Sequence, residues 1–215
     1  MRRLFISTCV AALLLFGVWM NAQAQRGGGQ GNQGQGNGQG NENQGDGGES
    51  EIQRGFQIAP VTLNLSGKNP SLVGLGSYLV NGPGDCIGCH TAPITGTPSP
   101  FLPGGNPFVG QTAVVNKAAY LGGGNPFGPF ISRNLTPDKN GLPAGLTLDQ
   151  FKLTIRTGVD LKALPPDVPS SPGFLQVMPW PQIRNATDRQ LEAIYEYLRS
   201  IPCIQGGPGQ SSNRC

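Results

Sequence analysis

Two cysteines and the only histidine of this 215-residue chain stand together as Cys86-Ile87-Gly88-Cys89-His90. Thiols three positions apart lie on about one helical turn, so both can add to vinyl groups on one edge of a porphyrin. The histidine that follows directly then reaches the iron from one side. The spacing predicts that Cys86 and Cys89 attach one haem covalently and that His90 is an axial ligand of its iron.

Met178 is available as a second axial ligand, between Val177 and Pro179. The two other methionines lie within the first twenty residues. A thioether opposite the histidine gives the His/Met pairing that raises the reduction potential of a haem iron and fills its last coordination position. A lone methionine also serves as a filler of apolar cores, so both roles are open for Met178.

Cys-x-x-Cys pairs also occur in thioredoxin-like redox sites and in zinc sites. A zinc site needs two further ligands, but Cys203 and Cys215 lie far along the chain without a histidine beside them. A thioredoxin-like pair is expected between a strand and a helix, whereas Gly82-Pro83-Gly84-Asp85 precedes Cys86. Both alternatives fit the surrounding sequence less well than haem attachment does.

The first residues have the pattern of an export signal. Arg2 and Arg3 precede an almost entirely apolar stretch, residues 4–20, and Ala22-Gln23-Ala24 supplies the small residues of a cleavage site. We expect residues 1–24 to be a signal peptide and the protein to be periplasmic or otherwise exported from a bacterial cell. Retention of the apolar stretch as a membrane anchor is the alternative. After cleavage no stable membrane insertion is expected.

Export bears on the remaining cysteines, because disulfides persist outside the cytoplasm. Once Cys9 leaves with the signal peptide and the haem has used two more cysteines, Cys203 and Cys215 are left. We expect them to form a disulfide that closes a C-terminal tail, residues 203–215, and two free thiols are the alternative.

Residues 27–48 contain eleven glycines and no apolar side chain. Such a composition cannot bury enough surface to offset the entropy lost on ordering, so we expect residues 25–55 to be a disordered Gly/Gln/Asn-rich linker. We interpret it as a tether, with self-association of the Gln/Asn-rich tract as the alternative. The folded domain is then expected at residues 56–202, enough chain for one core.

Three segments have the pattern of helices. Apolar residues recur at helical spacing in residues 71–80, and the capping-box pairs Thr147/Gln150 and Thr187/Gln190 each begin a further helix. The chain between the first two is rich in glycine and proline, which predicts long loops with no convincing sheet.

Within these loops the run Gly104-Gly105-Asn106-Pro107-Phe108 recurs from Gly123 to Phe127. We interpret it as a repeated turn without symmetry of the fold, and residues 112–115 as a brief strand. The composite prediction is a mainly α fold around a flat apolar cofactor.

These motifs resemble the class I c-type cytochromes, particularly the single modules in cytochrome subunits of bacterial periplasmic dehydrogenases. The resemblance covers about residues 70–202 and rests on five runs: residues 76–82, 85–91 and 132–138, Met178-Pro179-Trp180, and residues 188–202. It implies cytochrome c-like helices around one covalent haem c, with His90 as the proximal and Met178 as the distal ligand.

The N- and C-terminal helices cross in that family, which predicts Gly74 or Gly76 opposite Tyr195 or Leu198. The chain departs from the family pattern in having one haem motif, no apolar C-terminal stretch, and a long loop after His90.

Two further side chains are candidates for binding a haem propionate. Trp180 carries an indole N–H and Arg133 a guanidinium, either of which could donate to a carboxylate. Packing of Trp180 and surface exposure of Arg133 are the alternatives.

The expected function is single-electron transfer by a monohaem cytochrome rather than enzyme catalysis, between a dehydrogenase or quinol-linked complex and a downstream acceptor such as a terminal oxidase. Redox proteins are the expected partners: a dehydrogenase, an oxidase or a cytochrome complex. A formal charge of +3, without a clustered basic face, gives no reason to expect a nucleic-acid partner. The alternatives are a haem enzyme or gas sensor with Met178 off the iron, and a haem subunit permanently docked to a larger dehydrogenase.

Overall fold

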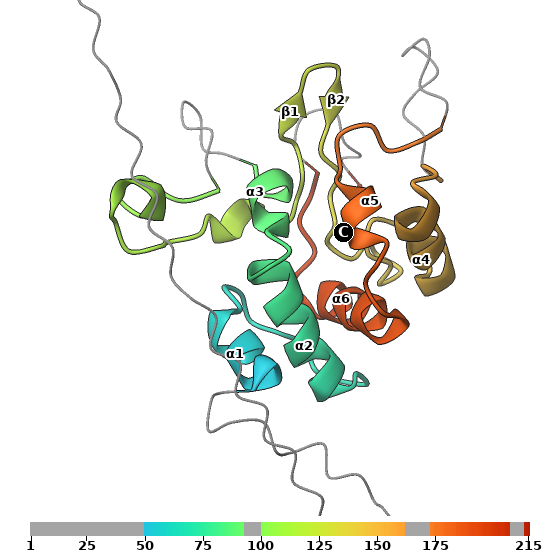
Figure 1. The fold of residues 1–215 in the computed structure, drawn as a ribbon. Helices are drawn as coiled ribbons and strands as arrows, with labels where there is room; N and C mark the ends of the chain where they lie inside the picture. Colours follow the sequence, from blue (N-terminus) through green and yellow to red (C-terminus); the bar gives the residue numbers. More distant parts are fainter. Residues whose placement is uncertain (1–49, 93–99, 162–172, 207–212) are drawn as a thin grey trace, which may run out of the picture. The chain divides into compact units, whose positions relative to one another are not determined.

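Helices joined by long loops form most of the regular structure (Figure 1). The computed structural model describes residues 50–92, 100–161, 173–206 and 213–215. In these residues the elements are α1 (Glu51–Ile58), α2 (Pro70–Asn81), α3 (Cys86–His90), the 3-10 helices η1 (Pro107–Val109) and η2 (Lys117–Ala119), β1 (Pro126–Phe127), β2 (Phe130–Ile131), α4 (Leu148–Thr157), α5 (Trp180–Ile183) and α6 (Asp188–Ser200). This helix-rich arrangement agrees with the mainly α prediction.

The three helices that the sequence predicts are present as α2, α4 and α6. At the start of α4, the Thr147 side chain accepts a hydrogen bond from the Gln150 backbone N–H, and the Gln150 side chain accepts one from the Thr147 N–H. Thr187 and Gln190 make the same two bonds at the start of α6. Each capping box satisfies amide groups that the first turn of a helix leaves unbonded, which is why both starts could be predicted from local sequence.

Helices α2 and α6 cross in close contact, and Gly76 of α2 makes that approach possible. A Cβ atom at Gly76 would lie 1.9 Å from the carbonyl oxygen of Ala193 and 2.7 Å from Cβ of Tyr197. The crossing expected from the family resemblance is therefore present. Gly76 faces Ala193 and Tyr197, whereas the prediction was Tyr195 or Leu198. The prediction named the wrong residues because the closest contact is with the backbone of Ala193.

The folded part begins earlier than the sequence predicts, because α1 lies partly inside the expected linker, residues 25–55. Ser50 and Gln53 form a capping box at its start. Ile52 packs on α2, where a Cβ atom at Gly74 would lie 2.7 Å from the Ile52 side chain. From the sequence alone, the start of this short amphipathic helix is included in the linker because glycine-rich residues directly precede it. Residues 25–49, like the predicted signal peptide, lie outside the described part of the chain.

The segment between α3 and α4 differs most from the sequence prediction. Residues 112–115 form no strand, and Val115 makes an isolated bridge with Phe101. A short antiparallel hairpin, β1–β2, pairs Phe127 with Phe130 and was not predicted. The repeated Asn-Pro-Phe run enters η1 at its first copy and β1 at its second, so it carries no symmetry of fold, as expected.

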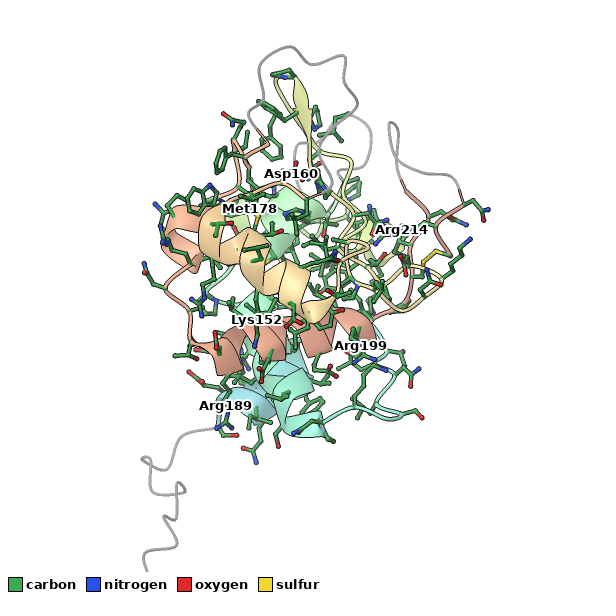
Figure 2. All side chains as sticks on the ribbon, turned by 90° about the vertical axis from the view of Figure 1, so that its right-hand side faces the viewer. Lys152, Asp160, Met178, Arg189, Arg199 and Arg214 are labelled. Atoms are coloured by element: carbon green, nitrogen blue, oxygen red, sulfur yellow. A yellow bond between two sulfur atoms is a disulfide. The ribbon has the colours of Figure 1, made fainter. Side chains whose placement is uncertain are left out.

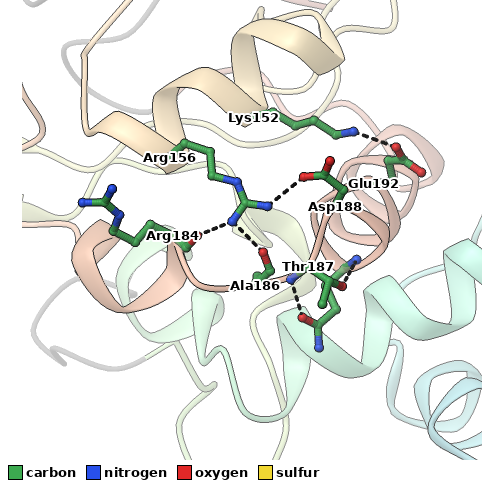
Figure 3. A network of polar contacts seen from close by, with 8 residues as sticks. Lys152, Arg156, Arg184, Ala186, Thr187, Asp188 and Glu192 are labelled. Atoms are coloured by element: carbon green, nitrogen blue, oxygen red, sulfur yellow. Dashed lines mark hydrogen bonds and ion pairs between the residues drawn. The ribbon is translucent and has the colours of Figure 1, made fainter.

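A network of polar contacts joins α4 to α5 and α6 (Figure 3). Arg156 of α4 donates to the Asp188 carboxylate at 2.7 Å and to the Ala186 carbonyl oxygen at 2.6 Å. It also donates to the carbonyl oxygen of Arg184. One side chain thus fixes the end of α5 and the start of α6 against α4, and α5 directly follows the segment that carries the predicted second ligand.

The tail contains the predicted disulfide, since Cys203 and Cys215 are bonded, with their Cα atoms 5.8 Å apart. No helix in the described ranges combines the length and apolar character needed to cross a membrane.

Candidate cofactor-binding site

A cavity of about 330 Å³ brings the predicted iron ligands and attachment residues together. Cys86, Cys89 and His90 of α3 line it, and Met178 lines it as well. Most other lining side chains are apolar and come from the hairpin, the loop before α4, α4 itself and the segment before α5: Phe127, Phe130, Leu135, Leu146, Phe151, Ile155, Phe174 and Leu175. Apolar walls with a few convergent polar groups are typical of small-molecule sites.

Figure 2 shows where this site lies along the molecule. Met178 and Asp160 lie toward the hairpin, whereas Lys152, Arg189 and Arg199 lie toward the opposite side. The hairpin and the segment before α5 contribute residues to the lining of the cavity, whereas none of its described lining residues belongs to α2 or α6.

The two cysteines of α3 are free thiols. Burial, and after it the Asp85 carboxylate, raises the pKa of Cys86 to about 12 and also raises the pKa of Cys89. Reactive redox cysteines have instead a lowered pKa, because the thiolate is the nucleophile. The raised pKa of both thiols therefore counts against the thioredoxin-like alternative.

His90 is held by a backbone carbonyl. Its Nδ1 atom lies 2.7 Å from the carbonyl oxygen of Arg133. A carbonyl oxygen only accepts, so Nδ1 must carry the proton and Nε2 keeps its lone pair in the neutral ring. Burial lowers the pKa of His90, which favours that neutral form. This is the second contact that commonly orients a metal-ligating histidine.

Met178 lies just before α5, partly buried against the core. Its carbonyl oxygen accepts from the Trp180 N–H at 2.7 Å. No group of three or more His, Cys, Asp and Glu side chains in the described residues could hold a metal ion. Met178 and His90 line the same cavity although they lie far apart in sequence.

The predicted propionate partners have protein partners in the structure. The Trp180 indole N–H donates to the Leu175 carbonyl oxygen at 3.2 Å. The Arg133 guanidinium pairs with the Asp160 carboxylate at 2.6 Å, and both of these side chains line the cavity. Contact of Trp180 or Arg133 with a propionate stays a prediction, and Arg133 is the better placed of the two.

Asp160 and Thr154 are polar residues of the cavity that were not predicted from the sequence. Asp160 is the ionic partner of Arg133, and nothing in the sequence pairs residues so far apart. Thr154 interrupts the apolar face that α4 presents through Phe151 and Ile155. Its buried hydroxyl has no hydrogen-bond partner among the described residues, whereas Thr157 on the same helix donates to the Leu153 carbonyl oxygen at 2.7 Å. An unbonded hydroxyl beside an apolar cavity fits a bound group that also carries polar atoms.

Part of this chain is similar to a gluconate 2-dehydrogenase cytochrome c subunit from Pantoea cypripedii, with 28% identity over 130 residues. The match covers 60% of this chain and 23% of the relative, so the chain spans less than a quarter of the relative's length. No family model matches the chain, and no solved structure does. The similarity suggests a c-type cytochrome. It supports a role in electron transfer.

Proposed function

We propose that this chain is a class I, monohaem cytochrome c that transfers single electrons. The observation that carries the proposal is the shared cavity, which is lined by two thiols, an imidazole oriented by a backbone carbonyl, a thioether and apolar side chains. A bound haem supplies an iron that takes up and releases one electron, tuned by its axial ligands and surroundings.

The residues of this chain would divide the work as follows. Cys86 and Cys89 would hold the haem covalently, each by addition of its S–H group across a vinyl double bond, which makes one C–S and one C–H bond without net oxidation. His90 would hold the iron through Nε2, and the Arg133 carbonyl oxygen would keep its ring in that orientation. Met178 would supply the second ligand of the iron. The apolar side chains of the hairpin and α4 exclude water from the ring.

The biological setting is the second part of the proposal. Residues 1–24 would direct export and be removed, since attachment of haem c and the disulfide both require an exported compartment. Electrons would come from a dehydrogenase or quinol-linked complex and pass to an acceptor such as a terminal oxidase. The similarity to a dehydrogenase cytochrome subunit supports redox protein partners.

A visible spectrum with redox titration tests the function. The proposal expects the sharp reduced bands of a covalent low-spin haem, one single-electron transition, and no carbon monoxide binding at the reduced iron. Ready binding of carbon monoxide would instead favour the enzyme or sensor alternative, in which Met178 does not hold the iron.

The name of the relative favours a second candidate, a haem subunit permanently docked to a dehydrogenase. The Gly/Gln/Asn-rich linker would then be the arm that tethers the chain to the dehydrogenase. Pull-down from the native source with the full chain and with residues 25–49 deleted tests this, because the deletion spares α1 and its packing on α2. Stable co-purification of a dehydrogenase that needs the arm would support the docked subunit, and the absence of a stable partner would favour the free carrier.

A further inference from the structure

The C-terminal tail contacts the turn that follows Arg133, residues 134–136, which we call the proximal turn. The Asn134 side-chain amide donates to the Ile204 carbonyl oxygen at 2.8 Å. The Ile204 N–H donates to the Thr136 hydroxyl at 3.1 Å. Asn134 and Thr136 are almost fully buried, 3% and 0% exposed. Ile204 therefore binds both ends of the proximal turn in the interior.

Arg214 holds the same turn from the other end of the tail. Its guanidinium donates to the Thr136 carbonyl oxygen, and its own carbonyl oxygen accepts from the Lys139 N–H at 2.8 Å. Ile204 directly follows Cys203, and Arg214 directly precedes Cys215. The disulfide therefore joins the cysteines next to the two residues that hold the proximal turn.

The proximal turn begins at the peptide group that orients His90. The Arg133 carbonyl oxygen accepts from His90 Nδ1 at 2.7 Å, and the His90 carbonyl oxygen accepts from the Gly123 N–H at 2.7 Å. A Cβ atom at Gly123 would lie 2.4 Å from the Arg133 carbonyl carbon and 2.5 Å from Asn134 N. Gly123 thus packs against the Arg133–Asn134 peptide. A shift of the proximal turn must move the carbonyl that holds the histidine.

We propose that Ile204 and Arg214, tied together by the Cys203–Cys215 disulfide, are positioning residues for the proximal histidine. They act through the proximal turn and the Arg133 carbonyl oxygen. A hydrogen bond from Nδ1 raises the basicity of a ligating imidazole, and so stabilises the oxidised metal. Loosening the tail should weaken that bond and raise the reduction potential. The effect on the potential rests on the proposed function, whereas the ordering of the turn does not.

The experiment compares variants of the full exported protein. Cys203→Ser with Cys215→Ser opens the tail without a change of charge, Arg214→Ala removes one contact, and Arg214→Lys restores a cationic donor. Arg189→Ala is the matched control, since it removes one positive charge from an exposed position on α6, away from the proximal turn. Amide hydrogen exchange and the midpoint potential are measured for each variant.

The double serine variant and Arg214→Ala should each speed amide exchange at residues 134–136 and 204 by about tenfold or more. Both should also raise the midpoint potential. A positive charge near the iron destabilises the oxidised form, so loss of that charge by itself lowers the potential. A rise in the potential of Arg214→Ala therefore cannot come from the lost charge. Arg214→Lys should recover part of both effects, and Arg189→Ala should leave exchange in the turn unchanged.

Unchanged exchange in the proximal turn would overturn the proposal, and so would faster exchange with an unaltered potential in haem-loaded protein. The absence of any covalent haem in wild-type protein would instead refute the proposed function, while the exchange measurement would still report on the tail. If the double serine variant does not accumulate, Arg214→Ala with its lysine counterpart decides the question alone.

Discussion

The carboxylate of Asp160 lies 2.6 Å from the guanidinium of Arg133, and both side chains border the cavity that contains His90 and Met178. The two side chains are mostly buried, with 13% and 26% of their surface exposed. Charges in such positions are screened less than charges in open solvent. This ion pair therefore places two opposite charges where each can act on an iron in the cavity.

Replacing the members of this pair should shift the midpoint potential in opposite directions. Asp160→Asn removes a negative charge and should raise the potential, whereas Arg133→Gln removes a positive charge and should lower it. Arg133→Gln keeps the backbone carbonyl that holds His90. Redox titration of both variants and of the double variant checks this. Shifts of the same sign in the two single variants would show that the charges are not the cause.

Met178→Ala should keep the covalent haem, because Cys86, Cys89 and His90 are all unaltered. It should change the spin state of the oxidised iron and lower the midpoint potential, since the Met/His pairing is what raises it. Absorbance spectra and redox titration test this, with the exposed Leu153→Ala on α4 as a control. A Met178→Ala protein with the spectrum and potential of the wild type would refute the ligand assignment.

Gly76→Ala should destabilise the protein by about 1–3 kcal/mol, a typical cost of overpacking a close contact. The added Cβ atom would meet the Ala193 carbonyl oxygen, and α2 and α6 would have to separate. Urea unfolding of the haem-loaded protein measures the loss. Ser71→Thr, which also adds one carbon atom but at an exposed position in the first turn of α2, should have little effect. Equal stability of Gly76→Ala and wild type would contradict the close crossing.

The hydrogen bond from Arg156 lowers the pKa of Asp188. A lowered folded-state pKa gives stability that is present above the unfolded pKa of about 3.9 and is lost as the pH falls through the folded value. Asp188→Asn should therefore reduce stability at neutral pH, by a small amount because the pair is exposed, and the difference should shrink as the pH falls below the unfolded pKa. Urea unfolding over a series of pH values from neutral to acidic measures this. In an Arg156→Ala background the substitution should lose most of its effect, and a persistent difference there would exclude the pair as its source.

Local signals explain what the sequence could predict. The capping boxes at Thr147 and Thr187, the apolar spacing of residues 71–80 and the cysteine–histidine spacing each involve residues within a few positions of one another. The disulfide followed from counting cysteines in an exported chain. Such features can be recognised without knowledge of how the rest of the chain folds.

Contacts between distant segments could not be predicted in the same way. The carbonyl that holds His90 belongs to Arg133, and any residue type at that position could supply it. Asp160 and Thr154 become cavity residues only because the hairpin, α4 and the segment before α5 meet. The start of α1 was missed because its apolar residues depend on α2 for their burial.

Intact mass spectrometry of the exported, unreduced protein tests the central claim most directly. We expect one species that begins at Gln25 and carries the added mass of a single haem on Cys86 and Cys89, less two hydrogens for the Cys203–Cys215 disulfide. Cys86→Ala with Cys89→Ala should remove the added mass. A wild-type protein with the mass of the bare polypeptide would contradict the account.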